Sequence, residues 1–210
     1  MNSEDVWALD GAQCAAECTS TILRWNGTKW LSSQVSFGAA GLAATPTGQV
    51  WAVGDARVDR DLQPVGGAVA YIRTATGWRY VPGIPDRQTL RRCGCGFVVA
   101  SDNDVWLDNA HWNGQRWHLL RIPTDEYPEG PMVTDGRGGV WFGPWLHWTG
   151  HAWINTSVYP YGPTWLAKYG GLVQAMARIP GTGTVLAGGI LIHEQPVRVY
   201  ALLMSFGKMP

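Results

Sequence analysis

The chain has 210 residues, and its 16 basic and 16 acidic side chains give a formal net charge of zero. Proteins that hold nucleic acid or an anionic membrane surface usually carry a basic excess, so this balance argues against both kinds of partner. Charged residues make up only 15% of the chain, whereas glycine (27) and tryptophan (13) are abundant, which is typical of many strands joined by tight turns.

A short motif recurs along the chain and predicts a repeat architecture. Its copies are Asp5-Val6-Trp7, Gln49-Val50-Trp51, Asp104-Val105-Trp106, Gly139-Val140-Trp141 and the degenerate Thr184-Val185-Leu186. The valines lie 44, 55, 35 and 45 residues apart, which is close to the roughly 40–50 residues of one four-stranded blade of a β-propeller.

An aromatic hairpin follows each copy of the Val-Trp motif. Clear copies span residues 23–30, 110–117 and 146–153, and looser ones are Ala70-Tyr71-Ile72 before Gly77-Trp78 and residues 202–207. Asn-Gly between two aromatic strands is a strong hairpin signal, because glycine tolerates positive φ. A short strand of small apolar residues and a turn precede the later Val-Trp motifs, as in residues 41–44 and 97–100.

These segments predict an all-β fold, a β-propeller of about five four-stranded blades. Each blade has an inner strand A, strand B at Val-Trp, and strands C and D in the aromatic hairpin. The blades are expected at about residues 1–40, 41–82, 96–121, 131–155 and 172–210 of a single domain that spans residues 1–210. A helical alternative fails because glycine and proline interrupt every window of about a dozen residues.

Eleven of the 13 tryptophans fall on repeat positions. The sequence resembles the Trp-rich, kelch-like propeller repeat found in many secreted bacterial proteins, and the resemblance extends from Asp5 to Gly207. It implies an extracytoplasmic or secreted protein and brings no catalytic motif with it. Residues 1–5 lack the basic and apolar regions of a signal peptide, so the chain is either intracellular or has a trimmed start, and the resemblance favours secretion. No run of about 18 apolar residues predicts a transmembrane helix.

The predicted ring is incomplete when its strands are counted. Three strands are expected in the first unit, four in each of the next three and three in the last, which gives 18 where five closed blades need 20. Strand edges left open in this way are normally avoided. We expect sequence upstream of Met1 to supply the missing strands, or else an irregular closure at the N-terminus, strand exchange, or a dimer through the open blade edges.

The A–B and C–D turns are predicted to be tight, whereas the B–C and D–A connections vary in length, so their face is the expected site of function. The two tryptophans outside the repeat, Trp145 and Trp165, lie in these connections with Tyr159 and Tyr161. Aromatic planes stack on sugar rings or proline-rich peptides, so these four residues are predicted to bind a ligand. The alternative is a loop that covers the apolar edge of its own ring.

Charged residues gather on the same face, and the predicted ligand-binding set also includes Arg91, Arg92, Asp125, Glu126 and His193. A hydrolase or lyase that uses acidic and histidine residues there is the alternative function. Glycosidases need two carboxylates about 5–10 Å apart, and the inner strands predicted here contain no Asp or Glu. Solvated loop charges are therefore the simpler interpretation, and the sequence favours a protein that is not an enzyme.

The four cysteines form two close pairs, Cys14 with Cys18 and Cys93 with Cys95. Disulfides are favoured over free thiols, and zinc is disfavoured because neither spacing is the usual Cys-x-x-Cys. All four cysteines are expected on the B–C/D–A face.

The sequence therefore predicts a non-enzymatic binding module that recognises a glycan, a peptide or a partner protein through the B–C/D–A face. Gly-x-Ser-x-Gly, P-loop and dinucleotide motifs are absent, and no cofactor, metal or catalytic residue is predicted. His111 and His147 occupy equivalent strand C positions beside tryptophan, so they are predicted to be structural.

Overall fold

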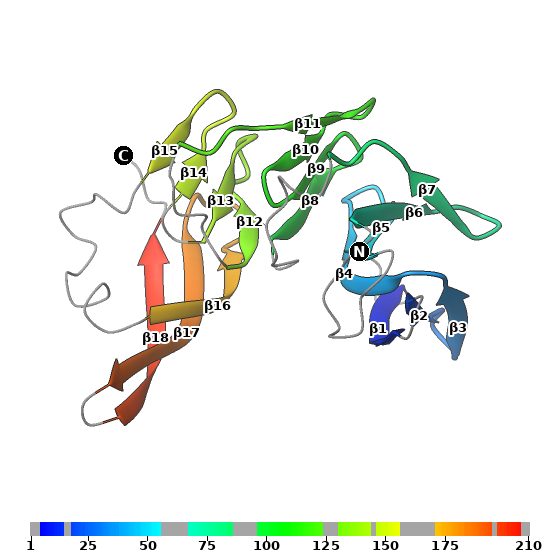
Figure 1. Cartoon of the computed structure of the whole chain (residues 1–210), viewed down its shortest axis with the longest axis horizontal. Helices are drawn as coiled ribbons and strands as arrows, with labels where there is room; N and C mark the ends of the chain where they lie inside the picture. Colours follow the sequence, from blue (N-terminus) through cyan, green and yellow to red (C-terminus); the bar gives the residue numbers. More distant parts are fainter. Residues whose placement is uncertain are drawn as a thin grey trace. The chain divides into compact units, whose positions relative to one another are not determined.

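The computed structural model describes residues 5–14, 18–55, 67–85, 96–123, 130–143, 146–155, 171–194 and 197–206. Within them the chain forms strands β1 to β18 and no helix, and the strands make five antiparallel sheets of three or four strands (Figure 1). The chain divides into two compact units, residues 1–120 with sheets 1 to 3 and residues 121–210 with sheets 4 and 5. A search of the described part for a helix that could span a membrane finds none.

The first unit contains three sheets whose strands follow one another in chain order. Sheet 1 consists of β1 (Val6–Cys14), β2 (Cys18–Trp25) and β3 (Trp30–Val35). Sheet 2 consists of β4 (Gly38–Ala44), β5 (Val50–Asp55), β6 (Ala68–Arg73) and β7 (Trp78–Val81). Sheet 3 consists of β8 (Phe97–Ser101), β9 (Asp104–Leu107), β10 (Ala110–Trp112) and β11 (Trp117–Leu119).

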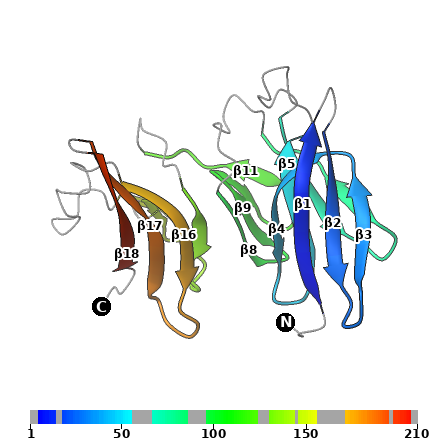
Figure 2. The same ribbon diagram turned by 90° about the horizontal axis from the view of Figure 1, so that it is seen from below.

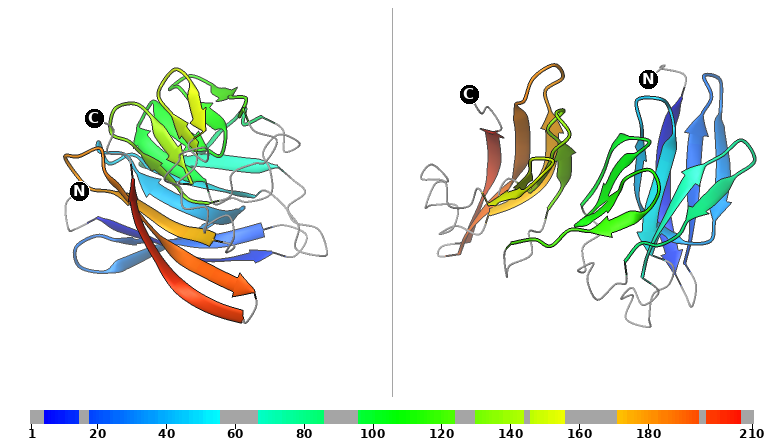
Figure 3. Two further views of the ribbon diagram at one scale, coloured as in Figure 1. Left: turned by 90° about the vertical axis from the view of Figure 1, so that its left-hand side faces the viewer. Right: turned by 90° about the horizontal axis from the view of Figure 1, so that it is seen from above.

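The second unit contains two sheets of the same kind. Sheet 4 consists of β12 (Met132–Thr134), β13 (Val140–Phe142), β14 (Leu146–Trp148) and β15 (Trp153–Asn155). Sheet 5 consists of β16 (Gly171–Arg178), β17 (Val185–Glu194) and β18 (Val197–Phe206). Figure 2 shows β16, β17 and β18 side by side, and Figure 3 shows the twist of these orange and red strands.

The all-β prediction is confirmed, as is the expected division of the described strands into five sheets of three, four, four, four and three. The five predicted valines all lie on strands, which we call the Val-Trp strands: β1, β5, β9, β13 and β17. Each Val-Trp strand pairs in antiparallel fashion with the strand that follows it in the chain. The repeat is therefore structural as well as sequential.

The aromatic hairpins share one turn geometry. In sheets 1 to 4, the first residue of the hairpin turn donates its backbone N–H to the carbonyl oxygen of the residue three positions later. These bonds join Asn26 to Lys29, Thr74 to Gly77, Asn113 to Arg116 and Thr149 to Ala152. Gly27 has a φ of 90° and Gly114 one of 92°, values that a residue with a Cβ rarely adopts. The Asn-Gly signal is thus explained by backbone conformation.

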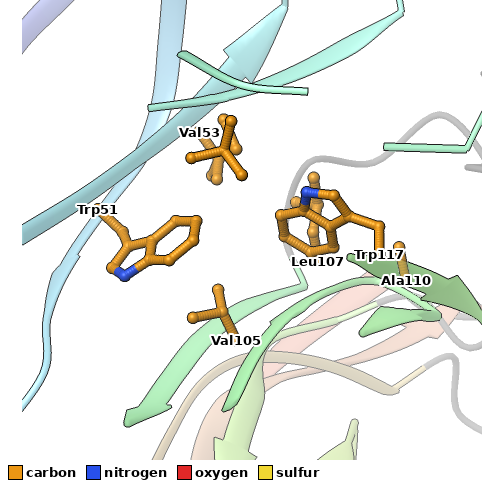
Figure 4. Packing of buried hydrophobic residues seen from close by; sticks show 8 residues of the cluster. Trp51, Val53, Val105, Leu107, Ala110 and Trp117 are labelled. Carbon is orange, nitrogen blue, oxygen red and sulfur yellow. The ribbon is translucent and has the colours of Figure 1, made fainter. Parts of the chain in front are cut away.

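Alternation along the strands gives every sheet two distinct faces. We call the side that carries the valine of the Val-Trp motif the first face, and the side that carries the tryptophan (Leu186 in sheet 5) the second face. In the first unit, the second face of sheet 1 packs on the first face of sheet 2, around Ile22, Phe37 and Ala52. The second face of sheet 2 packs in the same way on the first face of sheet 3, around Trp51, Val105 and Trp117 (Figure 4).

Burial of the Val-Trp motif follows from this packing. Trp51, Trp106 and Trp141 are 2%, 1% and 4% exposed, which confirms the prediction that they are buried. Trp7 is only partly buried. Val6 is 46% exposed and Leu186 40% exposed, although the four other valines of the motif are at most 3% exposed. Both exceptions lie in the sheets of three strands.

Candidate functional site

The predicted ligand-binding residues lie almost entirely outside the described residues. This holds for Trp145, Tyr159, Tyr161, Trp165, Arg91, Arg92, Asp125 and Glu126. His193 is placed near the end of β17, opposite Arg198 of β18, but its side chain lies outside the described set. The aromatic and charged site therefore stays a prediction.

The two edges of the sheets differ in the connections that they carry. At one edge, here called the short-turn edge, the Val-Trp strand begins and the aromatic hairpin turns, and every connection has two to six residues. At the opposite loop edge, connections range from two residues to 15. The four longest are residues 56–67, 82–96, 120–131 and 156–170. The long connections are thus confined to one edge, where side chains can differ without changing the sheets.

Asp108 is the most unusual titratable residue that the structure describes at the loop edge. It occupies the two-residue turn between β9 and β10 with a φ of 50°, and no other described residue except glycine has a positive φ. Its side chain is only 4% exposed, and its Oδ1 atom has no hydrogen-bond partner. Burial raises the pKa of the Asp108 carboxyl to about 7, although a hydrogen bond from the Gly96 backbone acts to lower it.

The turn that contains Asp108 fastens two of the long connections to sheet 3. The Asp108 backbone N–H donates to the carbonyl of Gly96 at 2.6 Å, where the 82–96 connection ends. Asn109 holds Leu120 at the start of the 120–131 connection: its Nδ2 donates to the Leu120 carbonyl at 2.9 Å, and the Leu120 N–H donates back to the Asn109 carbonyl at 2.9 Å. The turn positions the ends of both connections.

Chemically, Asp108 is a carboxyl group poised between its neutral and charged forms near neutral pH. Groups of this kind occur at catalytic sites, but also in buried structural positions. Asp108 is not among the residues predicted for the site, although the sequence contains a signal for it: Asp-Asn between two strands suits a two-residue turn with left-handed backbone.

The two histidines beside tryptophan have a geometry that supports a structural role. His111 stacks on Trp106 with centroids 4.2 Å apart, and its Nε2 atom lies 2.9 Å from Asp104 Oδ1. Because Asp104 begins the Val-Trp strand β9, this group lies toward the short-turn edge and not the loop edge.

Sheet 4 repeats the arrangement with a carboxylate from a different position. His147 stacks on Trp141 at 4.1 Å, and its Nε2 atom lies 3.0 Å from Asp135 Oδ2. A Cβ at Gly139, the position equivalent to Asp104, would collide with the Asp135 carboxylate and the Trp148 carbonyl. Burial acts to raise the pKa of Asp135, but hydrogen bonds from Arg137, Gly139 and His147 together hold it below its ordinary value. Because Gly139 has no Cβ, the Asp135 carboxylate can occupy the space that a side chain at position 139 would fill.

In sheet 1 the histidine position is taken by arginine. Arg24 lies over the Trp7 ring at 5.4 Å and its Nε donates to Asp5 Oδ1 at 2.7 Å. Arg24 pairs directly with Trp7 across the ladder, as His111 pairs with Trp106. Sheets 1, 3 and 4 therefore share one arrangement. An arginine or histidine side chain lies over the tryptophan of the Val-Trp motif and also contacts a carboxylate.

The cysteines are described in part. Cys14 and Cys18 face each other across the β1–β2 ladder, at the loop edge of sheet 1. Cys18 is 1% exposed and is disulfide-bonded, with a partner sulfur that lies outside the described side chains. Cys93 and Cys95 are outside the described residues, so the pairing and the common face of all four stay predictions. Among the side chains that the structure describes, no three His, Cys, Asp or Glu residues come together as metal ligands.

Comparison with known proteins does not assign this site: no family model matches the chain, and neither the curated proteins nor the solved structures searched give a match.

Proposed function

We propose that the five sheets are blades of a β-propeller that is incomplete or unusually closed, and that the protein is a non-enzymatic binding module. Its ligand is a glycan, a peptide or a partner protein, bound through the loop edge by Trp145, Tyr159, Tyr161 and Trp165. An extracytoplasmic location remains part of this proposal on the resemblance to secreted Trp-rich repeats.

One observation supports the proposal above the others: all the long connections emerge at the loop edge, while the opposite edge is restricted to turns of two to six residues. A rigid scaffold with variable loops at one edge is the arrangement in which proteins place binding residues. The leftover tryptophans belong to these connections, as Trp165 lies within residues 156–170 and Trp145 between β13 and β14.

Binding of immobilised glycans and peptides on an array, followed by titration of any hit, tests this function. We expect Trp165→Ala and Trp145→Ala to weaken binding by roughly 1–3 kcal/mol each, because aromatic anchors dominate such sites. Melting should change little if these rings contact ligand rather than core. Tyr80→Ala is the matched control, since Tyr80 is 47% exposed on β7 within sheet 2. Full affinity in both tryptophan variants would show that the aromatic site is wrong.

The hydrolase or lyase alternative is retained because of Asp108, a buried carboxyl with a pKa near 7 at the loop edge. Catalysis requires two or three convergent titratable groups, and the described contacts of Asp108 are to the backbone of Gly96. If an array hit were turned over, Asp108→Asn would separate the two functions. Loss of turnover with retained binding would favour the enzyme, whereas no turnover by the unmodified protein favours the binding module.

A further inference from the structure

One turn at the loop edge has the same backbone geometry in sheets 3 and 4. In sheet 3, Asp108 follows the Val-Trp strand β9 and donates its backbone N–H to the Gly96 carbonyl at 2.6 Å. In sheet 4, Gly143 follows β13 and donates its N–H to the Pro131 carbonyl at 2.9 Å. The φ angle is 50° at Asp108 and 54° at Gly143. The two positions are therefore equivalent in both backbone conformation and hydrogen bonding.

Sheet 4 shows that this backbone hydrogen bond does not require a carboxyl group. Glycine adopts the left-handed conformation without strain, whereas a residue with a Cβ adopts it at a loss of stability. Gly143 also brings no charge to the turn. Asp108 therefore adds a buried titratable group at a position where the repeat can use glycine, and this addition calls for a physical role of its own.

The Asp108 carboxyl lies where a negative charge is poorly compensated. The residue is 4% exposed, and its Oδ1 atom has no hydrogen-bond partner. The hydrogen bond from the Gly96 backbone favours the charged form, but burial has the larger effect and raises the pKa to about 7. Loss of the proton therefore leaves a buried carboxylate with one oxygen unpaired, which favours movement of the side chain toward water.

The charged groups described around this turn do not neutralise that carboxylate. The strands of sheet 3 end in apolar residues at the loop edge. On neighbouring sheet 2 the charged residue described at the loop edge is Asp55, a further carboxylate, and Arg121 in the 120–131 connection is exposed and screened by solvent. The remaining charged groups and thiols of the two connections, in residues 86–95 and 125–129, lie outside the described residues.

We propose that ionisation of Asp108 opens the Asp108–Asn109 turn and releases Gly96 and Leu120 from sheet 3, so that rising pH loosens the anchors of two long connections. Both anchors depend on this turn, because Asp108 holds Gly96 and Asn109 holds Leu120 through two hydrogen bonds of 2.9 Å. All four residues belong to the first unit, so the second unit is not involved. The inference goes beyond the proposed ligand site and does not depend on it.

The direction of the effect follows from the protons that each state binds. The closed turn keeps a proton on Asp108 up to about pH 7, whereas an open turn exposes a carboxyl with the ordinary pKa of 3.8. Opening therefore becomes more favourable as pH rises between these two values, and the effect levels off above about pH 7. With these pKa values, the equilibrium constant for opening increases about 100-fold from about pH 5 to about pH 8.

Amide hydrogen exchange, measured by NMR at several pH values between about 5 and 8, tests the proposal. Leu120 reports on the turn, because its N–H donates to the Asn109 carbonyl. Its protection factor, which corrects for the pH dependence of intrinsic exchange, should fall about 100-fold across this range. At about pH 8 its exchange should also be insensitive to low concentrations of urea, because a local opening exposes little surface.

Two substitutions remove the carboxyl, and a third is the matched control. Asp108→Gly copies the residue at Gly143, and Asp108→Asn keeps the shape of the neutral side chain. In both variants the protection factor of Leu120 should change less than about 3-fold over the same pH range. Asp102→Asn removes a carboxylate from the turn between β8 and β9 of the same sheet, at the short-turn edge, and should keep the full pH dependence.

Three results would overturn the proposal. One is a protection factor of Leu120 that does not change with pH in the unmodified protein, and another is an equal loss of protection in the Asp108 variants. The third is exchange of Leu120 that rises steeply with urea at about pH 8, since Asp108 would then act on global unfolding alone. If Asp108→Asn fails to fold, Asp108→Gly decides the question, because Gly143 shows that glycine fits this turn.

Discussion

Replacing Asp108 by asparagine should make the protein more stable at neutral pH, and the gain should disappear in acid. Asparagine has the shape of the neutral carboxyl and tolerates the left-handed backbone found at this turn. In the folded protein the carboxyl has a pKa of about 7, against an ordinary value of 3.8. Between these two pH values the folded chain retains a proton at Asp108 that the unfolded chain has released.

The direction of the effect follows from proton linkage. A state that binds more protons is favoured by lower pH, so Asp108 makes the free energy of unfolding fall as pH rises from about 4 to about 7. A pKa difference of about 3 units, at about 1.36 kcal/mol per unit, amounts to about 4 kcal/mol above pH 7. This is an upper value, since a charged Asp108 can relax toward solvent. Asp108→Asn should therefore match the unmodified protein at pH 4 and exceed its stability by up to about 4 kcal/mol at pH 8.

Urea unfolding of both proteins, followed by tryptophan fluorescence at several pH values between 4 and 8, measures this difference directly. Comparing the two proteins cancels the contributions of the other carboxylates. Asp102→Asn is the control: hydrogen bonds from Thr45 and Thr47 hold the pKa of the exposed Asp102 below its ordinary value, so its effect should be constant between pH 5 and 8. A stability difference for Asp108→Asn that does not vary with pH would refute the reasoning.

Two further predictions concern the repeat. Trp51→Ala should lower the free energy of unfolding by about 3–5 kcal/mol through the cavity it leaves, whereas Trp30→Ala, at a ring that is 50% exposed, should cost much less in the same urea titration. Gly139→Ala should cost about 1–3 kcal/mol, because its Cβ would collide with the Asp135 carboxylate and with the Trp148 carbonyl oxygen; a stability equal to that of the unmodified protein would show that both groups move aside freely.

The strands could be predicted from the sequence because their signals are local. Asn26-Gly27 and Asn113-Gly114 fix hairpin turns through backbone conformation alone, and the spacing of Val-Trp motifs gives the number of sheets. The same local reasoning identified His111 and His147 as parts of the repeat, because equivalent positions face equivalent neighbours. Each of these features depends on residues close together in the sequence or directly paired across a ladder.

The remaining features depend on contacts that no local pattern records. Val6 matches Val105 in sequence yet differs from it in exposure, because burial depends on which sheet covers a face. Asp135 replaces the missing carboxylate at position 139 from the preceding turn, which requires the turn geometry to be known. The raised pKa of Asp108 arises from its burial at the loop edge, and burial is a tertiary property. The predicted aromatic site at Trp145 and Trp165 lies outside the described residues and stays a prediction.

Asp108 also bears on why the loop edge is the candidate site. A left-handed non-glycine residue and a buried carboxyl that resists ionisation both lower the stability of the fold. Residues that lower stability tend to be replaced during evolution unless their position has a function that requires them. Here both costs fall on one two-residue turn that fixes the ends of the 82–96 and 120–131 connections. At the short-turn edge, in contrast, the positive φ values that the structure describes occur at glycines such as Gly27 and Gly150, which adopt them without strain. At Asp108 both costs thus fall where two of the long connections are anchored, as the proposed use of that edge for binding predicts.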